Sequence, residues 1–225
     1  VPNSKIRNTI ASRMVKNLAT AAHYSIFSDI DMTEAIRLRE RLNQNQKDNP
    51  YVKVSYNDII IKCAAKAIEK APLINSSFCE DHIKVWNNVN FGVAVAVDNG
   101  IIVPVVHQCQ EISLIEVAKI NANNITAVRT GKFDPELTSG GTITISSMGM
   151  LGVSRFTSII NQPESAIISV GSIIDKPVVI DKNIVIRPIM TITSTFDHRG
   201  IDGAVGAFFA KKLKEYLEEP YLLLK

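Results

Sequence analysis

Apolar residues recur at steps of three and four positions in five stretches of the chain, and this spacing predicts five helices. Three serines and one aspartate precede four of these stretches, where a side-chain oxygen can accept a hydrogen bond from a free backbone N–H of the first turn. The expected helices are 5–18 after Ser4, 33–45, 56–70 after Ser55, 114–129 after Ser113 and 203–217 after Asp202. The 56–70 helix is apolar nearly all round, which predicts a central position in the fold.

Runs of alternating or β-branched apolar residues predict strands between the helices, at 23–31, 82–86, 89–97, 101–106, 142–147, 167–170, 177–180 and from 183 to 196. Pro104 has no N–H to donate, so part of the 101–106 strand should lie at a sheet edge or a bulge. Because helices interleave with paired strands and hairpins, we expect an α/β fold, a two-layer α+β sandwich with the helices packed on one mixed main sheet.

Composition sets further limits on what the chain can be. With 225 residues, 46% of them hydrophobic, and no linker or repeat, we expect residues 1–225 to form a single domain. The net charge of +3 is mild and the basic residues are scattered, so neither a nucleic acid nor a membrane is favoured as a partner. Cys63, Cys79 and Cys109 lack zinc spacing, so we expect no metal site and reduced thiols in a soluble intracellular protein.

The strongest candidate for chemistry is the corner at 195–204, where a strand ends and a helix begins. His198 stands just before the turn that Gly200 and Gly203 allow, with Asp202 at the N-cap position. An imidazole there can take a proton from a hydroxyl or a thiol while its second nitrogen is held by another hydrogen bond. A packing histidine beside a simple helix cap is the alternative, and the spacing alone leaves both open because His-x-x-x-Asp is a weak motif.

A second candidate is the end of the 142–147 strand. It finishes in two hydroxyls, Ser146 and Ser147, and glycines follow at 149 and 152. This pattern is typical of a place where the backbone passes close to a ligand. No glycine-rich dinucleotide or phosphate-binding loop occurs in the sequence, which argues against a phosphate cradle of that type.

Several separate segments resemble the catalytic domain of the dihydrolipoamide acyltransferases, the core enzymes of 2-oxo acid dehydrogenase complexes. They run from end to end of the chain in the family's order. The matching segments are Ile10-Ala11-Ser12-Arg13-Met14, Lys53-Val54-Ser55-Tyr56-Asn57-Asp58, Gly100-Ile101-Ile102-Val103-Pro104, Gly140-Gly141-Thr142-Ile143-Thr144-Ile145-Ser146, Ile159-Ile160-Asn161, and Asp197-His198-Arg199 with Asp202-Gly203-Ala204.

The resemblance implies a chloramphenicol acetyltransferase-like fold and transfer of an acyl group between dihydrolipoamide and coenzyme A. It implies that His198 is the general base, Asp202 its partner acid and Ser146 the serine that bonds the oxyanion. Asp202 could orient the imidazole or pair with an arginine such as Arg13, and we favour the second role.

The resemblance also implies a place for coenzyme A, against an arginine of the second helix and the serine before the central helix. The residues at those positions, with the hydroxyls at the end of the 142–147 strand, are Arg39, Ser55, Ser146 and Ser147. Arg37 and Arg41 remain alternatives to Arg39.

In such proteins a homotrimer, with each active site between two subunits, assembles into a hollow cubic or icosahedral core. The implied partners are lipoyl domains and the decarboxylase and dihydrolipoamide dehydrogenase components of the complex. We expect the lipoyl domain that carries the lipoamide, and the subunit-binding domain, to be upstream domains absent from residues 1–225. The compartment would be the cytoplasm of a bacterium or, alternatively, the mitochondrial matrix. We expect the apolar tail at 221–224 to dock on a neighbouring subunit.

Segments 147–152 and 161–164 look more like acetyl-transferring members, the pyruvate dehydrogenase type, than like succinyl or branched-chain members, so we predict an acetyl group. Two positions depart from the family: Ala22, where proline is frequent, and Gly200, where a β-branched residue is usual and where glycine could loosen the His198 corner. Two alternatives stay open. One is a catalytically inactive core paralogue that binds partners, and the other is a free-standing acetyltransferase of the same fold that acts on an alcohol.

Overall fold

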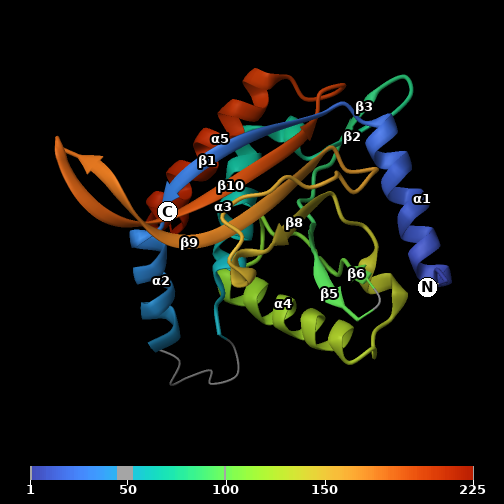
Figure 1. The fold of residues 1–225 in the computed structure, drawn as a ribbon, viewed down its shortest axis with the longest axis horizontal. Helices are drawn as coiled ribbons and strands as arrows, with labels where there is room; N and C mark the ends of the chain where they lie inside the picture. Colours follow the sequence, from blue (N-terminus) through green and yellow to red (C-terminus); the bar gives the residue numbers. More distant parts are fainter. Residues whose placement is uncertain (1, 45–52, 99, 225) are drawn as a thin grey trace.

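The main sheet organises the molecule (Figure 1). The computed structural model describes residues 2–44, 53–98 and 100–224. Within them the main sheet has the strand order β1-β10-β9-β8-β4-β7. Its strands are β1 (His23–Asp31), β4 (Phe91–Val93), β7 (Val105–Val106), β8 (Ile143–Ser147), β9 (Ala166–Ile180) and β10 (Asn183–Asp197). Strand β8 is parallel to β4 and β9, and the other pairs are antiparallel, so the predicted mixed sheet is confirmed.

Two short ribbons lie beside the main sheet. One pairs β2 (Ser76–Phe78) with β3 (Ile83–Val85), and the other pairs β5 (Val95–Val97) with β6 (Gly100–Ile102). The expected strands at 89–97 and 101–106 are therefore each split in two. Pro104 stands at the second break and leaves β7 as an edge strand of the main sheet, in agreement with the prediction.

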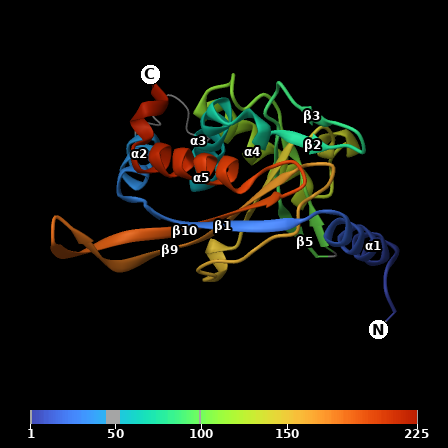
Figure 2. The ribbon, with the colours of Figure 1, turned by 90° about the horizontal axis from the view of Figure 1, so that it is seen from above.

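The helices form the second layer of the sandwich. Figure 2 shows α2, α3, α4 and α5 on one face of the main sheet, with α1 beside the sheet. Their bounds are α1 (Lys5–Thr20), α2 (Thr33–Gln44), α3 (Tyr56–Lys70), α4 (Leu114–Arg129) and α5 (Gly203–Glu218). Short 3₁₀ turns are η2 (Pro72–Ile74), η3 (Pro135–Thr138), η4 (Gly149–Leu151) and η5 (Pro220–Leu224). Residue 45, the expected end of the second helix, lies outside the described residues.

Local capping chemistry sets where three helices begin. The side chains of Ser4, Ser55 and Ser113 each accept a hydrogen bond from the backbone N–H three residues later, as predicted. Helix α3 is buried along most of its length and packs in the common core, so its predicted central position is also confirmed. Among the residues that the structure describes, no helix is long and apolar enough to cross a membrane.

The predicted buried face of α1 is only partly correct. Ile10 and Met14 are half-buried, but Leu18 is 58% exposed, and the side chain of Ile6 lies outside the described part of the chain. A single chain therefore leaves much of the apolar stripe of α1 in contact with solvent.

Strands β9 and β10 form one long hairpin, where the sequence suggested two separate runs at 167–170 and 177–180. The outer half of the hairpin projects beyond the helices (Figures 1 and 2). Its tip carries apolar side chains that are 71–78% exposed, namely Val179, Ile184 and Ile186. This is surface that a monomer leaves uncovered.

The carboxyl-terminal tail is not free. Pro220 is buried, Tyr221 is half-buried, and Leu223 packs against the core of its own chain. Docking of the tail on a neighbouring subunit stays a prediction, with less apolar surface to offer than the sequence suggested.

Candidate active site

The main chain of the His198 corner is fixed by short hydrogen bonds. The N–H of His198 donates to the carbonyl oxygen of Ala22, 2.8 Å away, in the turn before β1. The N–H groups of Gly200 and Ile201 donate to the carbonyl of Asp197 at 3.1 and 3.0 Å. The histidine therefore stands at the end of β10 on a turn that is tied to the neighbouring strand.

An ion pair between Asp197 and Arg199 stabilises the same corner. The Asp197 carboxylate is 1% exposed, and the Arg199 guanidinium donates to both of its oxygens, with Nη2 2.6 Å from Oδ2. Ala22 N–H also donates to Asp197 Oδ1, 3.2 Å away. Burial alone would raise the pKa of Asp197, but the bonds from Arg199 and Ala22 and the charge of Arg199 outweigh it and lower that pKa. The carboxylate stays ionised at neutral pH and keeps the turn in place.

The imidazole of His198 packs against the Tyr24 ring at a tilt of 52°. The ring centroids of Tyr24 and His198 are 4.6 Å apart, and the Tyr24 hydroxyl donates to the backbone carbonyl of Asp202 at 3.0 Å. Burial, followed by the charge of Asp202, raises the pKa of Tyr24 to about 12, so the hydroxyl remains a donor. A Cβ at Gly206 would lie 2.4 Å from the Tyr24 oxygen, which makes a glycine necessary there. In the single chain His198 remains exposed, so its ring is supported but accessible.

Asp202 occupies the N-cap position of α5 but makes no side-chain capping bond. Within the described residues its carboxylate forms no ion pair, with Arg13 or with any other cation, and no hydrogen bond to the His198 ring. Neither role expected for Asp202 is formed within one chain. At Gly200 the backbone is not left-handed, and an added Cβ would meet Phe78 and Ile83 at ordinary contact distances, so the corner does not depend on a glycine there.

Ser146 and Ser147 end β8 and are half-buried. Within the described part of the chain, the Ser146 hydroxyl has no hydrogen-bond partner. Gly149 follows at a point where a Cβ would lie 2.6 Å from the carbonyl oxygen of Gly171 on β9. The glycine therefore lets η4 approach the protein's own backbone. The close approach to a ligand expected from the sequence stays a prediction.

A buried acid, not singled out from the sequence, supports the strand that carries Ser146. Glu164 is 4% exposed, accepts from the Thr144 hydroxyl at 2.6 Å, and accepts from Asn161 Nδ2 at 3.2 Å. Burial raises the pKa of Glu164 to about 8 against the lowering effect of these two hydrogen bonds. Thr144 and Ser146 lie on the same face of β8, so Glu164 helps to fix the strand that presents the serine.

Within one chain, Ser146 and His198 lie toward opposite ends of the strands of the main sheet. Strand β8 is parallel to β9 and β10 is antiparallel to it, so the carboxyl ends of β8 and β10 point in opposite directions. Ser146 pairs with Ser169, which pairs with Thr193, and His198 lies five residues further along β10. Strand geometry then separates the two by roughly 16 Å along the sheet and about 10 Å across it, close to 19 Å in total.

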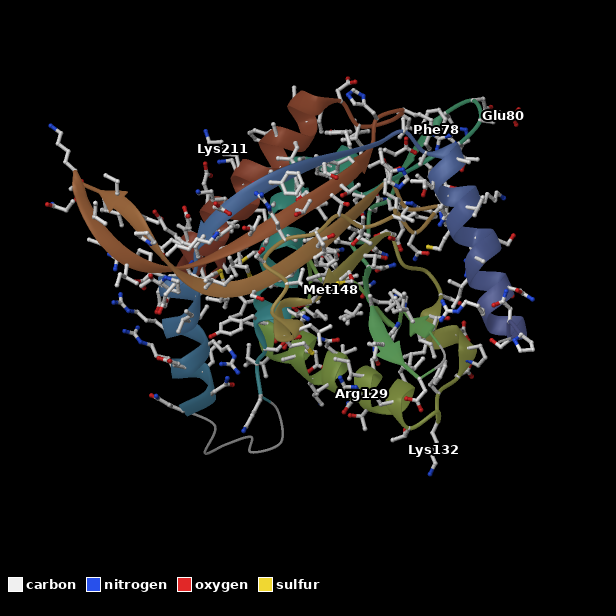
Figure 3. The ribbon with its side chains drawn as sticks, viewed as in Figure 1. Phe78, Glu80, Arg129, Lys132, Met148 and Lys211 are labelled. Atoms are coloured by element: carbon white, nitrogen blue, oxygen red, sulfur yellow. The ribbon has the colours of Figure 1, made fainter. Side chains whose placement is uncertain are left out.

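Figure 3 illustrates this separation. Phe78, whose ring lies 4.4 Å from the Arg199 guanidinium, is labelled at the upper edge of the molecule, whereas Met148, next to Ser147, lies near its centre. One chain alone therefore does not bring the two predicted residues together.

A third group lies where α2 meets the start of α3. Arg39 Nε donates to the carbonyl of Val54 at 3.0 Å, and its guanidinium lies 4.6 Å from the centre of the Tyr56 ring. Arg39 thus reaches the segment of Ser55, whereas Arg37 pairs with Glu34 and Arg41 with Tyr221. Within the described residues Arg39 has no carboxylate partner, so its charge is available to an anion.

The hydroxyl of Ser55 is committed to the fold. It donates to Asp58 Oδ2 at 2.7 Å in a capping box, and it accepts from the Asp58 N–H at 3.3 Å. In the ranges that the structure describes, no group of three or more His, Cys, Asp or Glu side chains could hold a metal ion.

Comparison with known proteins supports a specific family. The family model described as 2-oxoacid dehydrogenases acyltransferase (catalytic domain) matches residues 1–225. The dihydrolipoyllysine-residue acetyltransferase component of the pyruvate dehydrogenase complex of Rickettsia prowazekii is 37% identical over 224 residues, which is 100% of this chain and 55% of the relative. The mitochondrial counterpart of Schizosaccharomyces pombe is 37% identical over 223 residues, 98% of this chain and 46% of the relative. The chain thus spans about half the length of the curated relatives it matches.

Solved structures agree. A dihydrolipoamide acetyltransferase of Azotobacter vinelandii superposes with a TM-score of 0.95 at 27% identity, covering 100% of this chain and 93% of that one. That structure concerned a serine, a histidine and an asparagine in the catalytic mechanism, with the histidine 52 positions after the serine and the asparagine four positions after the histidine.

The cubic core of a pyruvate dehydrogenase multienzyme complex gives a TM-score of 0.95 at 28% identity, over 100% of this chain and 93% of that one. Chloramphenicol acetyltransferase, with a TM-score of 0.61 at 14% identity over 92% and 94%, shares the fold alone.

Proposed function

The chain belongs to the 2-oxoacid dehydrogenases acyltransferase family, and we propose that it transfers an acyl group between dihydrolipoamide and coenzyme A with His198 as the general base. The observation that carries this proposal is the His198 corner, where the main chain is fixed while the imidazole is accessible. Ser146, His198 and Asp202 also follow one another at intervals of 52 and four positions, the same intervals as in the Azotobacter vinelandii enzyme. Asp202 replaces the asparagine.

His198 has a definite task in this reaction. A free thiol has a pKa of about 8.5, so only a few per cent is thiolate at neutral pH. The imidazole takes the proton as the sulfur attacks the thioester carbonyl. It returns that proton to the departing sulfur when the carbon–sulfur bond of the original thioester breaks, so that this sulfur leaves as a thiol. A positioned base typically accelerates such a step by about a hundredfold to ten-thousandfold.

The donor to the tetrahedral oxyanion has to come from a second copy of the chain. The Ser146 of the same chain is roughly 19 Å from His198, whereas an oxyanion donor must lie within about 3 Å of the reacting oxygen. We therefore assign the oxyanion bond to Ser146 of an adjacent subunit, and one such donor contributes on the order of 3 kcal/mol. This arrangement requires an active site between two subunits, which the proposed homotrimer would provide.

Coenzyme A would lie against the group formed by Arg39 and Ser55, with Ser146 and Ser147 beside it. The free charge of Arg39 suits the phosphates of coenzyme A, because a guanidinium matches phosphate oxygens well. Asp58 holds the Ser55 hydroxyl hydrogen, so Ser55 would contact coenzyme A through its remaining lone pair or after rearrangement.

We further propose an acetyl group as the cargo, supported by the acetyltransferase relatives. The second thiol would be the lipoamide of a lipoyl domain outside residues 1–225. The trimers would assemble into a cubic core with the decarboxylase and dihydrolipoamide dehydrogenase components as partners, in a bacterial cytoplasm or, alternatively, the mitochondrial matrix.

The test is release of free thiol from acetyl coenzyme A and dihydrolipoamide by the wild-type chain, by His198→Ala and by His107→Ala. His107 is an exposed histidine far from the corner in sequence and serves as the matched control. His198→Ala should lower kcat by at least about a hundredfold, and His107→Ala should stay within about twofold. Undiminished transfer by His198→Ala would overturn the assignment of the base. An inactive wild-type chain that still forms large particles would instead favour a structural core.

A further inference from the structure

Both ring nitrogens of His23 are engaged with backbone groups. Nδ1 lies 3.0 Å from the carbonyl oxygen of Ala21, and Nε2 lies 3.0 Å from the backbone N of the fully buried Ile160. A carbonyl can only accept and an N–H can only donate, so the ring must carry its hydrogen on Nδ1 and a lone pair on Nε2. His23 is therefore a neutral imidazole with a defined tautomer.

The Ala22 peptide, which bonds the backbone of His198, lies directly before His23 in the chain. Ala22 stands between Ala21 and His23; its carbonyl accepts from the His198 N–H, and its N–H donates to Asp197. The N–H of His23 also donates to Ala21 O at 3.2 Å, so the segment folds into a tight turn. The position of the Ala22 peptide, and with it that of the His198 backbone, thus depends on where His23 is attached.

The attachment point is itself rigid. Ile160 is 0% exposed, and its carbonyl accepts from the side chain of Asn17, a buried residue of α1, at 3.1 Å. Two residues further on, the Gln162 side chain contacts the Thr20 hydroxyl at 2.9 Å, and that hydroxyl is also 2.8 Å from the carbonyl oxygen of Lys16. The backbone at 160–162 therefore offers a fixed N–H to Nε2 of His23.

We infer that His23 is a positioning residue for His198, and that the hydrogen bond its Nε2 accepts from the Ile160 N–H is needed for the acyl transfer to run at full rate. The inference rests on the proposed function, because it assumes that His198 is the base. His23 is not itself a second base: both of its nitrogens are already bonded, and it is only half-buried at the start of β1.

Two amide substitutions at His23 test the Nδ1 and Nε2 hydrogen bonds separately. In His23→Gln the side-chain oxygen can take the place of Nε2 and accept from Ile160, whereas in His23→Asn the shorter side chain can reproduce only the bond near Nδ1. Both residues are polar and uncharged, so the pair differs mainly in which bond survives. Thr20→Val is the matched control, because it removes a contact to the same 160–162 segment without touching His23.

The measurement is kcat and KM for coenzyme A per folded active site, at a temperature well below the melting point of every variant, with particle size checked for each. His23→Gln should keep kcat within about threefold, and His23→Asn should lose about ten- to a hundredfold, since small misplacements of a catalytic group have effects of that order. KM for coenzyme A should be unchanged in both, and Thr20→Val should match the wild type.

A His23→Asn protein with wild-type kcat, or one whose only change is a lower melting temperature, would overturn the inference. So would an equal loss of kcat in both amide variants. The wild-type and His198→Ala proteins are measured alongside. If His198→Ala lowers kcat but the His23 variants do not, this inference alone fails. If the wild type does not transfer acyl groups, the proposed function fails and the inference fails with it.

Discussion

Replacing the buried Glu164 by glutamine should change how the stability of the fold depends on pH. Burial raises the pKa of Glu164 from 4.5 to about 8. Between these two values the folded chain holds a proton that the unfolded chain has released, so the free energy of unfolding falls as the pH rises. Because one pKa unit corresponds to about 1.4 kcal/mol, the full loss across this window is about 4–5 kcal/mol. Below about pH 4.5 both states are protonated and the stabilisation is fully present; above about pH 8 it is gone.

Glutamine is nearly the same shape as the protonated acid and does not titrate, so Glu164→Gln should remove this part of the slope. Urea unfolding at pH values of about 5, 7 and 9, at one fixed protein concentration, measures the free energies. The free energy of unfolding of the variant should exceed that of the wild type by an amount that grows steadily with pH. At the highest pH the variant should be several kcal/mol more stable. Glu80→Gln, at an exposed acid labelled in Figure 3, is the control and should run parallel to the wild type. Parallel curves for Glu164→Gln would refute the assignment of a buried proton to Glu164.

Three further substitutions test the site itself. Gly206→Ala forces a methyl group against the Tyr24 hydroxyl, so it should lower stability by about 1–3 kcal/mol in thermal unfolding and reduce kcat; an unchanged protein would contradict the close packing of α5. Asp202→Asn should keep the rate of acyl transfer within about threefold of the wild type, because the carboxylate makes no bond to the imidazole within one chain. A larger loss would show a direct role or a partner on another subunit. Arg39→Met should raise KM for coenzyme A by about tenfold with kcat little changed, while Arg37→Met should leave both constants alone; equal behaviour of the two would remove Arg39 from the binding site.

The parts of the fold that were predicted correctly depend on local chemistry. The serines at 4, 55 and 113 fix the start of three helices because a capping bond reaches only three residues along the chain. The continuous β9 strand was not predicted, because its middle lacks an alternating pattern and is held in the sheet by pairing with β10. The exposed face of α1 was also missed, since periodicity reports an apolar stripe but not which surface covers it.

The features of the candidate site also divide into those that the local sequence predicted and those that depend on contacts between distant segments. The position of His198 on a strand-to-helix corner followed from glycines and a change of periodicity in neighbouring residues. The hydrogen bonds that hold His198 in place did not follow from the sequence. Ala22 and Asp197 are 175 residues apart and meet only through the pairing of β1 with β10. Glu164 carried no sequence pattern that marks a buried acid. The choice of Arg39 among three arginines likewise required its contacts with Val54 and Tyr56 at the start of α3.

The central claim is that each active site takes His198 from one chain and Ser146 from another, and mixing two inactive variants tests it most directly. His198→Ala and Ser146→Ala are each purified, then co-assembled in equal amounts from unfolded chains, and acyl transfer is compared with that of wild type treated identically. In a cyclic trimer with random mixing, about a quarter of the sites combine an intact histidine with an intact serine, so activity should return to about a quarter of the wild-type value. If the mixture of the two variants is no more active than the average of its components, although mixed trimers have formed, the two residues do not share a site between chains and the account is wrong.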